Sequence, residues 1–336
     1  MKSYTKLLAI GALATSVVAG PVAGQAAEKV LKFASFVPPI YILHKPVFEK
    51  LASDLDAATN GSVKIKIYAS GELGKGPAEQ YKRAVSGIAD LSYGLPGYTS
   101  SVFPKTLLLE LPGVTTSSAD ATAKLWKIMD SHLRAEFKRT RPIALFVTPP
   151  SVFMMRDKPI RKLEDLAGLK IRAVSKSAAA VLEAYGATPV QMPANKVYTA
   201  MNTGVVDGAL MGSDSLLIFK LIETSKYITR NLPEMPAIIF LVMNEGVYNG
   251  LSADERKAMD GLSGLDISQR SAAGLKKFGE IAQSKFAAIE GKEIIDLSAE
   301  ERAKFDAKAA EAVVKLAKEM EGRGIPANAI LEAVKN

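Results

Sequence analysis

Residues 163–212 decide the fold, and they read LEDLAGLKIRAVSKSAAAVLEAYGATPVQMPANKVYTAMNTGVVDGALMG. Near the beginning, Leu169, Ile171 and Ala173 place apolar side chains at alternating positions, which is typical of a short buried strand. From Ser177 to Tyr185 the apolar residues instead recur with the spacing of one helix face. The segment therefore begins as a strand followed by a helix.

The same alternation then repeats along the segment. Gly186 ends the first helix, and residues 188–190 read as the next strand. A second helix is predicted over residues 194–203, with Gly204 as its stop, and a third strand is predicted to begin at Val205. Alternating strands and helices indicate an α/β fold with a mainly parallel sheet, whose ligands bind beyond the carboxyl ends of the strands.

Arg172 lies at the end of the first of these strands, where it faces the predicted crevice. A guanidinium group can hold a carboxylate through two parallel hydrogen bonds, which a lysine cannot do. The alternative is a structural ion pair at the strand end, with Glu164 or Asp165 as the partner. The pattern by itself does not choose between these two roles.

Two stretches rich in helix-breaking and strand-breaking residues divide the chain. Thr148–Pro150 and Asn231–Pro236 each follow a predicted strand, and we interpret them as crossovers between two lobes. The predicted lobes are composed of residues 27–149 with 237–275, and of residues 150–236 with 276–336.

The first 26 residues are predicted to be a secretory signal peptide. Lys2 and Lys6 precede an apolar run over residues 7–18, and small residues follow up to Ala26. The apolar run is shorter than the roughly 20 residues that a membrane-spanning helix needs. We therefore expect a mature protein located in the periplasm.

The composition argues against several classes of protein. The net charge of +8 comes from basic residues scattered among acidic ones, without the basic and aromatic clusters of a nucleic-acid-binding surface. There is no cysteine, the only histidines are His44 and His132, and no catalytic or metal-binding motif is present. We expect a protein that is not an enzyme and that uses no cofactor. No residue is a candidate metal ligand, and the sequence leaves open whether a metal ion assists ligand binding.

The segment resembles the substrate-binding proteins of TRAP transporters, in particular those for dicarboxylates and sialic acid. The GLKIR strand and the YGATPVQMPANKVYTAMNTGVVDG stretch carry the resemblance. Further matching stretches occur in the expected order along the mature chain: LKFASFVPP, VKIKIYASGELG, VSGIADLSYG and LSADERKAMDGL.

The resemblance implies a two-lobed fold like that of periplasmic binding proteins, with a sheet in each lobe and two or more crossovers. It also implies a long helix within about residues 253–290 that spans both lobes. Arg172 would clamp the carboxylate of a small-molecule ligand, and the membrane subunits of the transporter would be the protein partners. We expect the receptor itself to act as a monomer.

Further candidate ligand contacts follow from the resemblance and from loops that come after strands. His44 has a helix-capping or surface role as its alternative, and Glu72 lies in a loop whose glycines also suit a simple turn. Aromatic candidates could equally belong to the core. The other candidates in the first lobe are Phe36, Val37, Tyr41, Tyr93, Gly94 and Tyr98. Those in the second lobe are Val152, Phe153, Met154, Met211 and Asp214.

Two departures from the family pattern bear on the ligand. Val152 and Met211 stand where relatives often have an arginine and an asparagine, while Arg156 is several residues too late to replace the arginine. An arginine among apolar residues suits an apolar or aromatic monocarboxylate. In the alternative, Met154 and Met211 pack behind the pocket. Two rival functions remain: a ligand-sensing receptor for a membrane kinase, and an extracytoplasmic enzyme acting on small anions.

Overall fold

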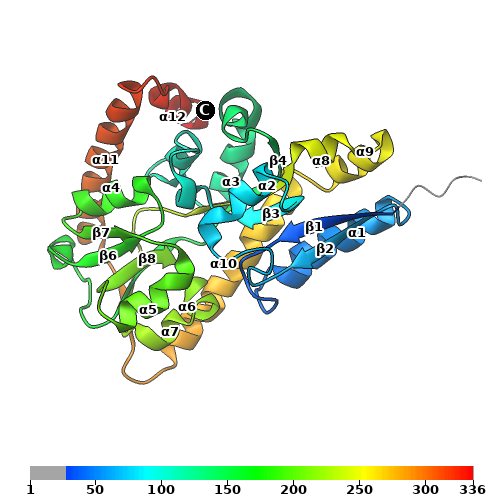
Figure 1. Ribbon diagram of the computed structural model, residues 1–336. Coiled ribbons are helices and arrows are strands. Elements are labelled where there is room, and N and C mark those ends of the chain that lie inside the picture. The colour runs from blue at the N-terminus through cyan, green and yellow to red at the C-terminus, as the bar shows by residue number, and fades with distance from the viewer. Residues whose placement is uncertain (1–27, 336) are drawn as a thin grey trace, which may run out of the picture.

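The chain folds into two mixed sheets with helices packed around them, as a computed structural model describes it for residues 28–335 (Figure 1). The first sheet has the strand order β2-β1-β3-β10-β4. Its strands are β1 (Lys29–Ala34), β2 (Val63–Tyr68), β3 (Leu91–Gly94), β4 (Thr140–Val147) and β10 (Ile238–Asn244). The predicted signal peptide lies outside the described residues.

The second sheet is built mostly from the segment that decides the fold. Its strand order is β11-β9-β5-β8-β6-β7. The strands are β5 (Ser151–Met155), β6 (Lys170–Ala173), β7 (Thr188–Gln191), β8 (Gly208–Gly212), β9 (Tyr227–Arg230) and β11 (Glu293–Asp296). The α/β fold with a sheet in each of two lobes is thereby confirmed.

Each sheet contains one strand that runs against its neighbours. In the first sheet β10 pairs antiparallel with β3 and β4, and in the second β5 pairs antiparallel with β8 and β9. Both strands directly follow a crossover between the sheets, at residues 148–150 and 231–237. The crossovers touch each other, because the Thr148 amide donates to the Ala237 carbonyl at 2.9 Å and Ala237 donates back to Thr148 Oγ1 at 2.9 Å.

A long helix connects the lobes, as α10 (Leu265–Ala287) runs between the two sheets in Figure 1. It packs against β4 in the first lobe and against β11 in the second. The predicted long helix within residues 253–290 is confirmed by α10. The shorter α9 (Ala253–Gly261) precedes it, and Gly264 between them has a φ of 102° that only glycine adopts easily. The exact division of the chain into two lobes remains our proposal.

The remaining helices cover the sheets. Short 3-10 and π turns extend several of them, for example at His44–Glu49 before α1 and at Ala194–Lys196 before α5. The helices are α1 (Lys50–Ala58), α2 (Gln80–Val85), α3 (Ser118–Lys127), α4 (Lys176–Ala184), α5 (Val197–Asn202), α6 (Ser215–Ile218), α7 (Leu221–Thr224), α8 (Glu245–Asn249), α11 (Ala299–Glu321) and α12 (Ala327–Lys335). Among residues 28–335, no helix is both long and apolar enough to cross a membrane.

The strand predicted to begin at Val205 begins instead at Gly208 as β8. Asp207 explains the later start, because it is engaged with the first residue of β6. Its amide donates to the Lys170 carbonyl at 2.8 Å, and its carboxylate accepts from the Lys170 amide at 2.8 Å. This connection fixes β8 beside β6, which holds Arg172.

The C-terminal helices reach both lobes. Helix α11 packs against α4 of the second lobe, whereas α12 packs against the turn Thr106–Glu110 of the first. Figure 1 shows α12 lying toward α3, away from the second sheet. A segment assigned to the second lobe therefore also contacts the first.

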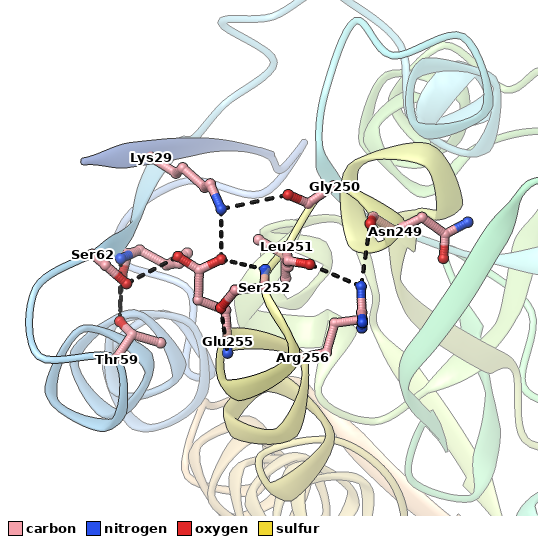
Figure 2. Close-up of polar contacts among 10 residues, drawn as sticks. Lys29, Thr59, Ser62, Asn249, Gly250, Leu251, Ser252, Glu255 and Arg256 are labelled. Atoms are coloured by element: carbon pink, nitrogen blue, oxygen red, sulfur yellow. Dashed lines mark hydrogen bonds and ion pairs between the residues drawn. The ribbon is translucent and has the colours of Figure 1, made fainter. Parts of the chain in front are cut away.

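The beginning of α9 is fastened to the first sheet by one buried carboxylate (Figure 2). Glu255 accepts hydrogen bonds from Lys29 Nζ, from Ser62 Oγ at 3.0 Å and from the Ser252 amide at 2.7 Å. Ser252 in turn caps the helix by accepting from the Glu255 amide at 3.2 Å. These partners outweigh desolvation and hold the pKa of Glu255 down at about 2.

We predict that Glu255→Gln lowers the free energy of unfolding at pH 7 by about 1–3 kcal/mol, because buried donors lose a charged acceptor. Since the folded pKa is depressed from 4.5, this stabilisation should be present above pH 4.5 and vanish as the pH falls toward 2. Urea denaturation across that pH range is the measurement. Asp254→Asn, at an exposed neighbour, is the control and should cost about 0.5 kcal/mol or less. Equal losses for both variants would contradict the assignment.

Candidate functional site

A narrow cavity, open at its mouth, lies between the two lobes. Residues from the carboxyl ends of β3, β6 and β8 line it, together with the loop after β1. This is the crevice where open parallel sheets bind ligands. Eight of the candidates named from the sequence line it: Phe36, Val37, Tyr41, Tyr93, Tyr98, Arg172, Met211 and Asp214.

Arg172 is a buried cation with part of its hydrogen-bonding capacity unused. It is 2 % exposed, and its Nε donates to the Met192 carbonyl at 3.0 Å. Its Nη2 is buried and has no partner among the described residues. Burial lowers the pKa of Arg172, although the nearby Tyr98 and Glu110 act in the opposite direction. Neither Glu164 nor Asp165 forms a salt bridge with it in the part of the chain described, which removes the support for the structural ion pair.

Glu110 is the acidic group whose charge acts to raise the pKa of Arg172, but its hydrogen bonds are made to other residues. Its carboxylate accepts from Ser175 Oγ at 2.7 Å and from the Ile238 amide at 2.9 Å. Burial raises its pKa to about 7, so the group carries only part of a charge near neutral pH. Arg172 therefore keeps a positive charge that Glu110 does not fully neutralise.

Aromatic rings form one wall of the cavity. Phe36 stacks on Tyr93 with ring centroids 5.7 Å apart, and it meets Tyr98 edge-on at 6.5 Å. The Tyr98 hydroxyl accepts a hydrogen bond from the Ala194 amide of the other lobe at 3.1 Å. The aromatic wall therefore runs from Tyr98, which is near Arg172, through Phe36 to Tyr93.

The opposite end of the wall is polar and buried. The hydroxyls of Tyr41 and Tyr93 lie 2.6 Å apart in a hydrogen bond. Asp214 is 4 % exposed, and its Oδ1 has no partner among the described residues. Burial raises the pKa of Asp214 to about 7, against its own amide and that of Ser215. Burial also raises the pKa of both phenols, with the charge of Asp214 as a further cause.

Three candidates of the first lobe lie away from the cavity lining. His44 is buried beside Phe48, with its Nε2 3.4 Å from a Glu49 carboxylate oxygen. Glu72 is exposed on its loop. Gly94 faces the core, where an added Cβ would lie 2.6 Å from the Phe240 ring, so close packing explains this glycine.

Val152, Phe153 and Met154 also lie outside the lining, and strand direction explains why. β5 is antiparallel, so its first residue, Ser151, pairs with Gly212 at the end of β8. Only that beginning of β5 reaches the edge where the parallel strands end. Val152 and Met154 pack in the core that includes Phe286, whereas Phe153 packs in the core that includes Phe305.

Arg156 does not replace the arginine that is missing at Val152. Its Nη1 donates to the Met201 carbonyl at 2.7 Å, and its Nε pairs with Asp157 at 2.6 Å. Met211, in contrast, lines the cavity. One of the two departures from the family pattern is therefore at the site, and the other is in the core.

Several lining residues were not found from the sequence. Six of the twelve lie at or beside the beginnings of the antiparallel strands β5 and β10, or in or beside helix α6, and eight of the twelve are apolar types that gave no signal of their own. Knowledge that β5 and β10 run antiparallel would have identified the lining residues at the beginnings of these two strands. The lining residues missed are Leu95, Thr148, Ser151, Val174, Ala194, Leu210, Gly212, Ser215, Ile218, Phe219, Ala237 and Ile239.

The lobes are closed over the cavity by hydrogen bonds between them. Besides the bond from Ala194 to Tyr98, the Lys176 amide donates to Ser100 Oγ at 3.3 Å, and Ser175 donates to Glu110. Separation of these bonds would allow the lobes to move apart and would widen the entrance to the buried arginine. The arrangement suits a receptor that opens and closes around a small molecule.

Comparison with known proteins identifies similar chains. The family described as "Bacterial extracellular solute-binding protein, family 7" matches residues 33–319. The C4-dicarboxylate-binding periplasmic protein of Rhodobacter capsulatus is 28% identical over 88% of this chain and 89% of its own length.

Two solved structures share the fold over nearly the whole chain. A TRAP solute-binding protein from Rhodoferax ferrireducens T118, in complex with copurified benzoate, has a TM-score of 0.86 and 28% identity over 91% of this chain and 96% of its own. A marine metagenome TRAP solute-binding protein specific for aromatic acids, bound to metahydroxyphenylacetate, has a TM-score of 0.87 and 26% identity, covering 92% of this chain and 98% of its own.

Proposed function

The chain belongs to the bacterial extracellular solute-binding proteins of family 7, and on that premise we propose that it is the receptor of a TRAP transporter for aromatic monocarboxylates. The ligand's carboxylate binds Arg172, and its ring lies against the wall formed by Phe36, Tyr93 and Tyr98. The closed receptor then delivers the ligand to the membrane subunits.

The observation that carries this proposal is the unpartnered Nη2 of Arg172 inside an aromatic cavity. A guanidinium that also uses Nε for Met192 still offers its remaining N–H groups to a carboxylate. Each charge-assisted hydrogen bond contributes roughly 1.5–3 kcal/mol, and a desolvated arginine without an anion forgoes that stabilisation. A carboxylate is therefore the ligand group that the site requires.

The apolar part of the lining favours an apolar ligand body. Met211, Leu210 and Ile218 offer no hydrogen bonds through their side chains to a second carboxylate or to a polyol. Each such group buried without partners costs about 1–3 kcal/mol. The aromatic acids bound by the two similar structures support the same class of ligand, although the C4-dicarboxylate-binding relative shows that the family also takes others.

The proposal also places the protein in the periplasm, as a single chain that works with the transporter's membrane subunits. The family description, an extracellular solute-binding protein, supports that location. Neither His44 nor His132 lines the cavity, so the histidines supply no catalytic base there. Cell fractionation and light scattering of the purified protein test the location and the single-chain state.

We predict that aromatic monocarboxylates such as benzoate and phenylacetate raise the melting temperature of the protein more than succinate, malate or sialic acid do. Ligands that bind only the folded state stabilise it in proportion to their affinity and concentration. A thermal-shift screen with equal concentrations of both groups is the measurement. Stabilisation by the dicarboxylates or sialic acid alone would exclude the proposed ligand class and leave the family membership intact.

We predict that Arg172→Lys weakens benzoate binding about tenfold or more, because lysine keeps the charge but loses the planar pair of donors. Isothermal titration calorimetry measures the change. Arg156→Lys is the matched control, since that arginine lies in the same lobe and faces away from the cavity, and its affinity should stay within about twofold of the native value. Native affinity in the folded Arg172→Lys variant would remove the carboxylate clamp.

A further inference from the structure

The cavity has a second polar end, and we propose that Asp214 with the Tyr41–Tyr93 pair binds a hydroxyl group on the ligand's ring. The preferred ligands are then aromatic monocarboxylates with a hydroxyl remote from the carboxylate. This inference rests on the proposed function and names the ligand more narrowly.

The two polar ends are distinct. Arg172 and Tyr98 both bond to residues 192–194, through the Met192 carbonyl and the Ala194 amide, whereas the hydroxyls of Tyr41 and Tyr93 bond to each other. Burial, with the charge of Asp214 as a further cause, raises the pKa of both of these phenols. Phe36 lies between the two polar ends, since its ring contacts Tyr98 on one side and Tyr93 on the other. A ring placed along Phe36 with its carboxylate on Arg172 therefore directs its far edge toward Asp214.

Burying Asp214 in the cavity wall is energetically unfavourable, and a ligand that bonds to its Oδ1 would offset that cost. Its Oδ1 is buried without a partner among residues 28–335, although burying an unsatisfied polar atom is unfavourable. Gly212 leaves the room for it, because a Cβ at that position would lie 2.5 Å from Asp214 Oδ1. The glycine thus leaves room for the Asp214 carboxyl group, whose Oδ1 accepts no hydrogen bond from residues 28–335.

The hydrogen-bonding groups at this end match a hydroxyl. Within the Tyr41–Tyr93 bond, one phenol uses its hydrogen for the other, which leaves the second phenol's hydrogen free to donate. Asp214 lines the same cavity and supplies an acceptor through Oδ1. A ligand hydroxyl donates to Asp214 and accepts from the phenol, whereas a methoxy group has no hydrogen to donate.

The same end disfavours a second carboxylate. An ionised carboxylate is only an acceptor, and it would face the acidic Asp214 across a desolvated gap. Specificity of this kind comes from repulsion of the wrong ligand as well as attraction of the right one. Asp214 therefore separates hydroxylated monocarboxylates from dicarboxylates that the arginine alone would accept.

The test compares ligands that differ in one group. Calorimetry with the full protein is carried out on benzoate, on the three hydroxybenzoate isomers, and on 3- and 4-methoxybenzoate. We expect the 3- or the 4-hydroxy isomer to bind at least about tenfold more tightly than benzoate. The 2-hydroxy isomer, whose hydroxyl lies beside the carboxylate, and both methoxy analogues should show no such gain.

Variants then assign the gain to Asp214. In Asp214→Ala the ratio between the hydroxylated ligand and benzoate should fall below about threefold, and Gly212→Ala, which displaces the carboxylate, should lower it as well. Asp214→Asn keeps an acceptor and should retain part of the ratio. Asp157→Asn, an exposed acid of the same lobe, is the control and should retain the whole ratio.

The outcomes separate the two proposals. If benzoate binds and no hydroxyl isomer binds more tightly, or if the ratio survives in Asp214→Ala, the second polar end is wrong while the proposed function stands. If neither benzoate nor any of its derivatives binds, the proposed function fails, and this inference fails with it.

Discussion

A buried guanidinium whose Nη2 meets no hydrogen-bond partner among residues 28–335 is the constraint on which the rest of the site depends. Arg172 is held by one carbonyl hydrogen bond and by the fields of Tyr98 and Glu110, and none of these neutralises its charge. Because Glu110 is occupied by Ser175 and Ile238 and has a pKa of about 7, it stabilises the arginine without displacing a ligand. The empty hydrogen-bonding position thus stays available to a carboxylate.

The topology brings the other residues to this arginine. Parallel strands from both sheets end at the cleft, and the crossovers at Thr148 and Ala237 are bonded together behind it. Hydrogen bonds between the lobes, such as that from Ala194 to Tyr98, hold the two sides of the cleft together. Closure of the cleft around a ligand removes water from the ligand's charge. Each electrostatic contact inside the cleft then becomes stronger.

Sequence reasoning reached the α/β fold because strand and helix periodicity is local, whereas the role of Arg172 was predicted from the family resemblance and stays a prediction. Whether β5 runs parallel or antiparallel is not local, and that direction places Ser151 in the cavity and Val152 in the core. Gly94 is a second example of a contact that is not local. Its close neighbour Phe240 lies on β10, which follows the second crossover between the sheets. Asp214 was named as a candidate, but the orphaned oxygen that gives it a role is visible only in three dimensions.

The most direct test of this account is a crystal structure of the protein with bound benzoate. The account predicts both carboxylate oxygens within about 2.7–3.0 Å of Arg172 nitrogens and the ring against Phe36. A structure in which the carboxylate faces Tyr41 and Asp214, or in which benzoate binds outside the cavity and leaves Arg172 without an anion, would contradict it.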